Sequence, residues 1–333
     1  MANNEVAATK KKHKVGESIT KYFLLIADVL LIIVFGLIRP GFLQVSNLLD
    51  ILSTSALVGT IGLGASIVMT VGEMNFGVGA EATLTASILG FVLGKGNVSV
   101  YVIGVLIALL FVCLIGVIDS WLGVIVGVPA FIATLALSKI NDGFVNILTE
   151  GKTMFYSNWP DSFKWLGQGY IGPIPVMAVA FVIIALLLWF LMDKTKLGSN
   201  IQAVGANASC CKQVGINVKK IKIIAFILCS LVCGIGGIMA SSKTNNVTNT
   251  LGSGIMMDAM AAAMLGATFL RPGRFNVQGT VVAAVLTAII SNGITFCSYP
   301  DYIQDVVNGI ILLIAVGYIA MTRKEGLPSV KMG

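Results

Sequence analysis

Apolar runs long enough to cross a lipid bilayer recur along almost the whole chain, from residue 22 to residue 321. A transmembrane helix needs about 20 consecutive, predominantly apolar residues, and run after run approaches that length. A water-soluble core has no room for so many continuous apolar helices. The sequence therefore predicts a bundle of membrane-crossing helices.

The composition agrees with a membrane protein. Charged residues make up 11% of the 333 residues, whereas a soluble domain carries about 25%. Hydrophobic residues account for 56% before the 37 glycines are counted. We predict an all-α polytopic integral membrane protein in which one transmembrane domain, residues 22–321, accounts for nearly the whole chain.

We predict about ten transmembrane helices from the lengths of the apolar segments. The segments are 22–38, 48–71, 79–93, 98–126, 131–148, 171–192, 223–240, 255–270, 277–296 and 303–321. No small-residue cleavage site follows the first segment, so we expect it to remain as an uncleaved helix.

The positive charges predict the orientation of the bundle. Six segments precede the basic loop 193–222 and four follow it, so this loop falls on the same side as the tails 1–21 and 322–333. These regions and the short loop after Leu270 contain most of the 22 lysines and arginines. Loops rich in lysine and arginine stay in the cytoplasm. Both termini and the loop 193–222 are therefore predicted to be cytoplasmic.

Charge and motifs exclude several functional classes. The net charge of +7 is spread over separate loops, which does not favour nucleic-acid binding. The single histidine, His13, lies in a lysine-rich terminus, and no hydrolase elbow, metalloprotease motif or paired-carboxylate arrangement is present. Lys152 and Thr153 resemble the end of a phosphate-binding loop, but Asn146 replaces its first glycine. We therefore expect no enzyme activity and no nucleotide site.

The six cysteines form no CxxC pair and have no histidine partner. A disulfide framework or a zinc site is therefore not expected, and no metal-binding residues are predicted. Cys229 and Cys233 are four residues apart, on one helical face, and their simplest role is that of small packing residues. Small residues at Gly59, Gly62, Gly64, Ala65, Gly234, Gly236 and Gly237 also predict close helix contacts.

Several ionisable residues fall in or near the apolar segments, where an unpaired charge costs about 2.5 to 3.5 kcal/mol. Lys139 and Asp142 are three residues apart, and we interpret them as a structural pair rather than a substrate contact. Asp28 and Asp50 lie near segment ends, where their side chains can reach the membrane surface. The others are Glu81, Asp119 and Asp258.

Two features point to a polar path through the bundle. Asp119 lies deep in its segment with no basic residue within one turn, and it either lines such a path or serves the packing alone. The stretch 72–79 is rich in glycine and polar residues and separates two apolar runs. Non-helical backbone at membrane depth must contact protein or water. We therefore predict a broken helix beside the path.

Four stretches match motifs of a known family. GEMNFGVG at 72–79 stands where members carry a GGIDLSVG-like stretch, GVIDS at 116–120 stands for a GxxNG segment, and PAFIATL at 129–135 matches P-x-F-I-x-T-L. The loop sequence LGSNIQAVGAN at 197–207, followed by GINV at 215–218, is similar to G-x-x-x-x-A-V-G-x-N followed by G-I-x-V. Over nearly its whole length the chain resembles the permease subunits of bacterial ABC importers for ribose, other simple sugars and related small solutes.

The resemblance implies the function of a multi-pass permease in the bacterial plasma (inner) membrane. Its partners would be an ABC ATPase subunit, a second permease (a copy of itself or a sister subunit), an extracytoplasmic solute-binding protein, a small polar solute and membrane lipid. ATP would be used by the ATPase, so no cofactor is expected in this chain. The segment 22–321 would be the permease domain and 193–222 its coupling loop.

In such importers a short helix of this loop docks into a cleft on the ATPase. The resemblance carries that role to Ala203, Val204, Gly205, Ala206, Asn207, Gly215, Ile216, Asn217 and Val218. The alternative is that a basic loop only fixes the topology and touches anionic lipid.

The residues that we assign to the solute pathway are polar or aromatic and belong to the matched motifs or neighbouring segments. They are Glu73, Asn75, Phe76, Asp119, Phe131, Thr134, Asp142 and Asn292. Several depart from the family pattern: Asn75 replaces aspartate, Phe76 leucine, Gly77 serine and Asp119 asparagine, while Glu73 is an added acid. The identity of the solute is therefore not carried over.

Two other functions remain open from the sequence. An ion-coupled secondary transporter also needs glycine-broken helices and intramembrane acids such as Glu73, Asp119 and Asp258. A non-transporting membrane scaffold is the third possibility.

Overall fold

The computed structural model describes residues 22–93, 101–155, 159–270 and 274–324, and the predicted tail 1–21 and most of the tail 322–333 lie outside them. The described chain is almost entirely helical, which confirms the all-α prediction. A helix over Tyr22–Ile38 is followed by η1 (Pro40–Leu43), α2 (Val45–Thr70), α3 (Val78–Leu93), α4 (Tyr101–Ser120) with its π-helical continuation η3 (Trp121–Val126), α5 (Ala130–Thr149), α6 (Asp161–Gln168), α7 (Val176–Lys194), α8 (Lys196–Ala206), α9 (Ala208–Gln213), α10 (Val218–Thr244), α11 (Leu251–Gly266), α12 (Val277–Phe296) and α13 (Asp301–Lys324).

Each predicted apolar segment overlaps one of these helices, although several helices begin or end a few residues outside it. Six helices of the described residues are long and apolar enough to cross a membrane, namely α2, α4 with η3, α5, α7, α10 and α12. Tyr22–Ile38, α3, α11 and the part of α13 over Tyr302–Ile314 are shorter apolar helices. Two short antiparallel pairings tie the connections together, β1 (Met154–Phe155) with β4 (Asn246–Val247) and β2 (Tyr170–Ile171) with β3 (Ile174–Pro175).

Helices α2 and α10 form the centre of the bundle, and α3, α4, α11 and α12 pack around them. From Ser55 to Met69 every residue of α2 is buried. Small residues allow this close approach, as the sequence predicts: a Cβ atom at Gly64 would lie 3.0 Å from the carbonyl oxygen of Cys229. Lipid tails are as apolar as the helices, so no hydrophobic driving force brings the helices together in a membrane. Dispersion contacts at such short range hold them together instead.

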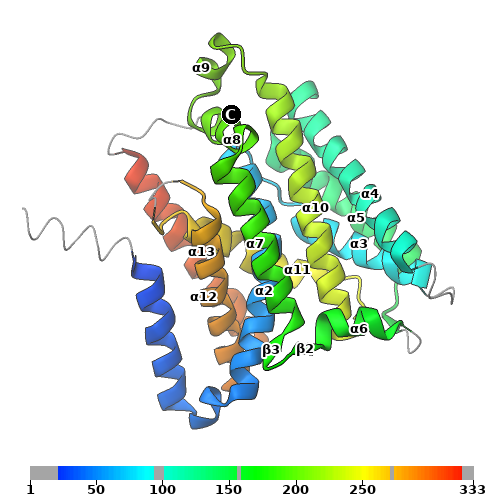
Figure 1. The fold of residues 1–333 in the computed structure, drawn as a ribbon, viewed down its shortest axis with the longest axis vertical. Helices are drawn as coiled ribbons and strands as arrows, with labels where there is room; N and C mark the ends of the chain where they lie inside the picture. Colours follow the sequence, from blue (N-terminus) through cyan, green and yellow to red (C-terminus); the bar gives the residue numbers. More distant parts are fainter. Residues whose placement is uncertain (1–21, 94–100, 156–158, 271–273, 325–333) are drawn as a thin grey trace, which may run out of the picture.

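The bundle has two distinct ends (Figure 1). Helices α8 and α9 lie at one end, which we call the α8 end, and α6 with the β2–β3 hairpin lies at the other, the α6 end. The helix Tyr22–Ile38 stands at the edge of the bundle and descends to η1, so that α2 runs from the α6 end to the α8 end. Helix α10 runs in the opposite direction, from α9 back toward α6.

The outer faces of the bundle are apolar. Large apolar side chains are exposed along Tyr22–Ile38, α4, α5 and α7, and Leu110, Ile147 and Leu187 are among the most exposed. A soluble monomeric protein rarely exposes so large an apolar surface, whereas such a surface fits contact with lipid tails.

One expectation about the buried charges is wrong. Asp28 was expected to reach the membrane surface, but it is only 7% exposed. It lies one turn after Leu24, on the helix face that packs into the core. The tertiary packing of this face, rather than the position in the sequence, decides where the carboxyl group lies.

The packing predicts that α10 tolerates no side chain at Gly237. A Cβ atom there would overlap the carbonyl oxygen of Ala82 on α3, and overpacking of this kind costs about 1 to 3 kcal/mol. We expect Gly237→Ala to lower the thermal unfolding temperature of the detergent-purified chain.

Gly143→Ala is the matched control. Gly143 also lies within a helix, α5, but a Cβ atom there would have no neighbour within 4 Å. Alanine is the better helix former by about 1 kcal/mol, so this variant should unfold at the same or a higher temperature. Equal unfolding temperatures for Gly237→Ala and the unsubstituted chain would contradict the packing argument.

Candidate functional site

The stretch between α2 and α3 turns back into the bundle. Near its start the Glu73 carboxylate pairs with the Lys222 ammonium, which lies just after the first turn of α10. Three residues from the end of the stretch, the Asn75 side chain donates to the sulfur of Cys229 at 3.6 Å. Cys229 lies about two turns, or 10 Å, further along α10 than Lys222. The stretch therefore descends alongside α10. Its backbone is non-helical at 71–77, as predicted for most of 72–79, whereas residues 78 and 79 already belong to α3. The solute path beside it stays a prediction.

Side chains satisfy the backbone of this stretch, which we call the broken segment (71–77). Gly72 has a φ of +87°, which allows the turn after α2. The backbone N–H of Gly77 donates to Asn75 Oδ1 at 2.7 Å, and that of Phe76 donates to Thr134 Oγ1 on α5 at 3.1 Å. Because no water replaces such bonds in a membrane interior, these two side chains hold the segment in its non-helical path.

Two buried acids lie beneath the broken segment. Asn75 Nδ2 donates to Glu81 Oε1 at 2.9 Å, and the carboxyl groups of Glu81 and Asp119 lie within hydrogen-bonding reach of each other. Both side chains are almost completely buried. From the sequence, Glu81 was named only as an intramembrane acid. The signal that places it in this cluster is its position one helical turn after Gly77, at the end of the broken segment. The described part of the chain holds no cation paired with either acid.

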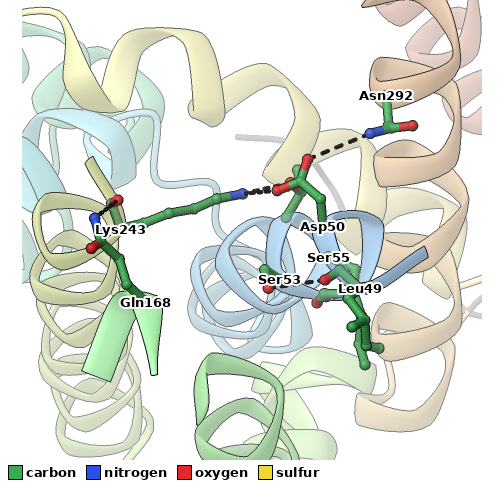
Figure 2. Close-up of polar contacts among 9 residues, drawn as sticks. Leu49, Asp50, Ser53, Ser55, Gln168, Lys243 and Asn292 are labelled. Carbon is green, nitrogen blue, oxygen red and sulfur yellow. Dashed lines mark hydrogen bonds and ion pairs between the residues drawn. The ribbon is translucent and has the colours of Figure 1, made fainter. Parts of the chain in front are cut away.

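A second polar cluster lies toward the α6 end (Figure 2). Lys243, near the end of α10, pairs with Asp50 Oδ1 of α2 at 3.0 Å and donates to Thr54 Oγ1 at 2.9 Å. From α12, Asn292 Nδ2 approaches Asp50 Oδ2 at 3.5 Å. Asp50 is 54% exposed, so this cluster is accessible from outside the bundle.

Helix α6 is hydrogen-bonded to the end of α10, beside this polar cluster. Gln168 Nε2 donates to the backbone oxygen of Lys243 at 3.0 Å (Figure 2), and the Ser242 hydroxyl donates to the backbone oxygen of Phe163. The end of α10 therefore links α6 to the cluster around Asp50.

The predicted loop 193–222 consists of α8, α9 and the start of α10. Two of its motif asparagines are helix N-caps: Asn207 Oδ1 accepts the N–H of Cys210 and Asn217 Oδ1 that of Lys220, both at 3.0 Å. Gly215 has a φ of +83° at the turn between α9 and α10. A Cβ atom at Gly205 would overlap the carbonyl oxygen of Thr70, so α8 rests directly on the end of α2. The motif residues therefore determine where α9 and α10 begin, where the chain turns between them, and how closely α8 packs against α2.

The nine predicted coupling residues divide by exposure. Val204 and Val218 are buried in the packing of the helices, and Ala203, Gly205 and Ile216 are half-buried. Exposed toward solvent are Ala206, Asn207, Gly215 and Asn217. Val214 also falls within the range 203–218 to which the resemblance carries the docking role, and it is 74% exposed at the end of α9.

The predicted pathway residues do not converge on one site. Asn75, Phe76, Thr134 and Asp119 lie around the broken segment, whereas Glu73 faces the α8 end and Asn292 the α6 end. Phe131 is exposed on the outer face of α5, and Asp142 on the same helix is half-buried. There Asp142 pairs with Lys139 at 3.0 Å, which confirms the structural pair expected from their spacing.

Comparisons with known proteins agree with the sequence motifs. Residues 47–316 match the family described as branched-chain amino acid transport system / permease component. The chain is 31% identical over 299 residues to the ribose import permease protein RbsC of Escherichia coli strain K12, covering 88% of this chain and 91% of that protein. It is 30% identical over 290 residues to RbsC of Bacillus subtilis strain 168, covering 86% and 88%. It is 29% identical over 307 residues to the galactofuranose transporter permease protein YtfT of E. coli K12, covering 87% and 86%.

No solved structure matches the chain. The apolar helices and these relatives together identify a multi-pass membrane protein.

The broken segment predicts a specific role for the Thr134 hydroxyl. Thr134→Val keeps the shape of the side chain but leaves the N–H of Phe76 without its acceptor, which costs about 1 to 3 kcal/mol. We expect a lower unfolding temperature for Thr134→Val, measured on the purified chain in detergent.

Thr134→Ser keeps the hydroxyl and loses only a methyl group, so it should stay closer to the unsubstituted chain. Equal destabilisation by valine and serine would show that packing, and not the hydrogen bond, is the contribution of Thr134.

Proposed function

The chain belongs to the branched-chain amino acid transport system / permease component family, and on that premise we propose that it is the transmembrane permease subunit of an ATP-driven ABC importer for a simple sugar or a related small polar solute. The observation that carries the proposal is the similarity to ribose and galactofuranose permeases over most of both chains. The family match covers most of the predicted permease domain 22–321. The chain has no enzyme activity of its own and moves the solute through alternating access.

The orientation follows from charge and topology. The α8 end faces the cytoplasm, because α8, α9 and the start of α10 carry lysines such as Lys196, Lys212 and Lys219. The α6 end then faces outward. All ten apolar helices cross the membrane, and both termini lie in the cytoplasm. The membrane is the bacterial plasma (inner) membrane.

The exposed part of α8 and α9 is the docking surface for the ATPase. It includes Ala206, Asn207 and Val214, on the cytoplasmic side of the bundle. ATP is bound and hydrolysed by the ATPase subunit, so this chain needs no cofactor.

The contacts of α8 suggest how the coupling works. Gly205 rests on the end of α2, and the neighbouring broken segment is joined to α10 by the Glu73–Lys222 ion pair. When ATPase closure moves α8, the end of α2 and the broken segment have to move with it or lose these contacts. The helices would then open toward the outside, receive the solute and reset.

The solute enters from the α6 end, delivered by an extracytoplasmic binding protein. The cluster of Asp50, Lys243 and Asn292 offers charged and amide groups that hydrogen-bond with sugar hydroxyls. Further inside, Asn75, Asp119 and Thr134 are buried in this conformation and meet solute only when the broken segment moves. A second permease, either a copy or a sister subunit, completes the pathway.

A secondary transporter is not favoured. Its requirement for intramembrane acids is met by Asp119 and Asp258, but the relatives are named as import permeases and ABC transporter permeases.

The function predicts two linked results. The tagged full chain, purified in mild detergent, should bring down an ATPase that hydrolyses ATP, because an ABC permease has no energy source of its own. Uptake of labelled ribose-class sugars by cells should fail when that ATPase is inactivated and continue when the proton or sodium gradient is dissipated. Repeated absence of an ATPase, with uptake that collapses with the ion gradient, would establish a secondary transporter instead.

The docking surface predicts the effect of Val214→Asp. A carboxylate placed in an ATPase interface loses water without gaining a partner, which costs several kcal/mol. We expect recovery of the ATPase with the tagged chain to fall at least about tenfold, a loss of about 1.4 kcal/mol.

Phe155→Asp is the control, because Phe155 is also 74% exposed but lies in β1, close to the α6 end. It should leave ATPase recovery unchanged. If Val214→Asp recovers as much ATPase as the control, Val214 does not belong to the docking surface.

A further inference from the structure

The centre of the bundle contains two thiols and a carboxyl group in close proximity. The sulfur atoms of Cys229 and Cys233 are 3.9 Å apart on α10. These sulfurs and a carboxylate oxygen of Glu81, on α3, all lie within 4.8 Å of one another, and all three side chains are buried. The cysteines are free, and their separation is far longer than a disulfide bond of about 2.05 Å.

The spacing matches a known kind of metal site. Two thiolates bound to one zinc ion at about 2.3 Å, with a tetrahedral angle between them, lie about 3.8 Å apart. We propose that Cys229, Cys233 and Glu81 form a binding site for a thiophilic divalent cation of the zinc class. The proposal does not depend on the transport function.

The unpartnered carboxylate oxygens provide an independent reason for a cation. Glu81 Oε2 and Asp119 Oδ1 are buried and form no hydrogen bond of standard geometry within the described residues, although the two carboxyl groups lie close to each other and the Ser230 hydroxyl lies close to Glu81. No lysine or arginine of the described chain forms an ion pair with Glu81. The loss of two thiol protons balances the charge of a divalent ion, so the net charge beside an ionised Glu81 does not change. The unpartnered carboxylate oxygen gains a cation in direct contact.

The surroundings orient the ligands as in known metal sites. Asn75 Nδ2 donates to Glu81 Oε1 and to the sulfur of Cys229. The first bond leaves Glu81 Oε2 free to coordinate, and the second is the kind of N–H to sulfur contact that fixes a ligand from the second shell. Asp119, within reach of Glu81, offers a fourth oxygen. Four ligands complete the tetrahedral geometry that zinc prefers.

The chemistry selects the class of ion. Magnesium and calcium take oxygen ligands almost exclusively, so two sulfur ligands exclude them as preferred occupants. Zinc and cadmium bind thiolates well. On binding, each thiol gives its proton to solvent and forms a metal–sulfur bond, and a coordinating carboxyl group that is protonated gives its proton to solvent as well. No change of oxidation state is involved. The broken segment covers the site through Asn75, so an ion would enter when that segment moves.

The test uses the full chain and the metal alone. The protein, purified in detergent and treated with chelator, is incubated with Cd²⁺ or Zn²⁺ and desalted, and the metal is counted by mass spectrometry. We expect about one bound ion per chain. With Cd²⁺, binding should also produce the ultraviolet charge-transfer absorption of a cadmium–thiolate bond.

Matched variants separate this site from other thiols. Cys229→Ser combined with Cys233→Ser should lose both the bound ion and the absorption. Cys211→Ser combined with Cys297→Ser, which leaves the proposed ligands in place, should keep both. Glu81→Gln keeps both thiols and should weaken binding at least about tenfold.

Two results would overturn the proposal. One is a wild-type chain that retains no more metal than the Cys229→Ser, Cys233→Ser variant. The other is a charge-transfer band that survives in that variant, which would assign the metal to other cysteines as an adventitious ion only. If the double serine variant does not fold, the wild-type stoichiometry and the effect of Glu81→Gln decide the question.

Discussion

The contact between α2 and α10 is the interaction on which the rest of the fold depends. Small residues bring the two backbones together. One ion pair joins α2 to α10 near one end, and another joins the broken segment after α2 to α10 near the other. Near the α6 end Asp50 of α2 pairs with Lys243 of α10, and near the α8 end Glu73, just after α2, pairs with Lys222. The Glu73–Lys222 pair is the less exposed of the two, so water screens it less than the Asp50–Lys243 pair. The two helices therefore move as one unit unless a pair breaks.

This unit connects the two ends of the bundle. At one end α8 rests on the last residues of α2, and at the other α6 is hydrogen-bonded to the last residues of α10. Events at either surface therefore act on the same pair of helices. For a permease that an ATPase drives from one side and a binding protein supplies from the other, this arrangement is what the proposed mechanism requires.

The interior carries polar groups that a purely structural bundle would avoid. Glu81 and Asp119 are buried together, with thiols beside them and a non-helical backbone above them. Each such group costs free energy in a membrane, and it persists where it is paired, protonated or bound to a ligand. The network around Asn75 holds the broken segment, so the same groups stabilise a part of the interior that is not held by helical hydrogen bonds.

The sequence by itself determined the class of the fold and much of its topology. Apolar runs of membrane length allow only helices, since no water is available for unpaired backbone groups. The Lys139–Asp142 pair and the break at 72–79 also follow from local spacing and composition. Local chemistry further explains Asn207 and Asn217, because an asparagine before a helix satisfies N–H groups a few residues away.

Only the tertiary structure decided which polar residues meet. Asn75 and Glu81 are only six residues apart, but Asp119 comes from α4, and its approach to them depends on how α3 and α4 pack against each other and against α10. The burial of Asp28 and the pairing of Asp50 with Lys243 are decided in the same way. The hydrophobic pattern of a sequence predicts which face of a helix is buried. A polar contact needs its atoms placed to within a few tenths of an ångström, and only the packing of the helices determines those positions.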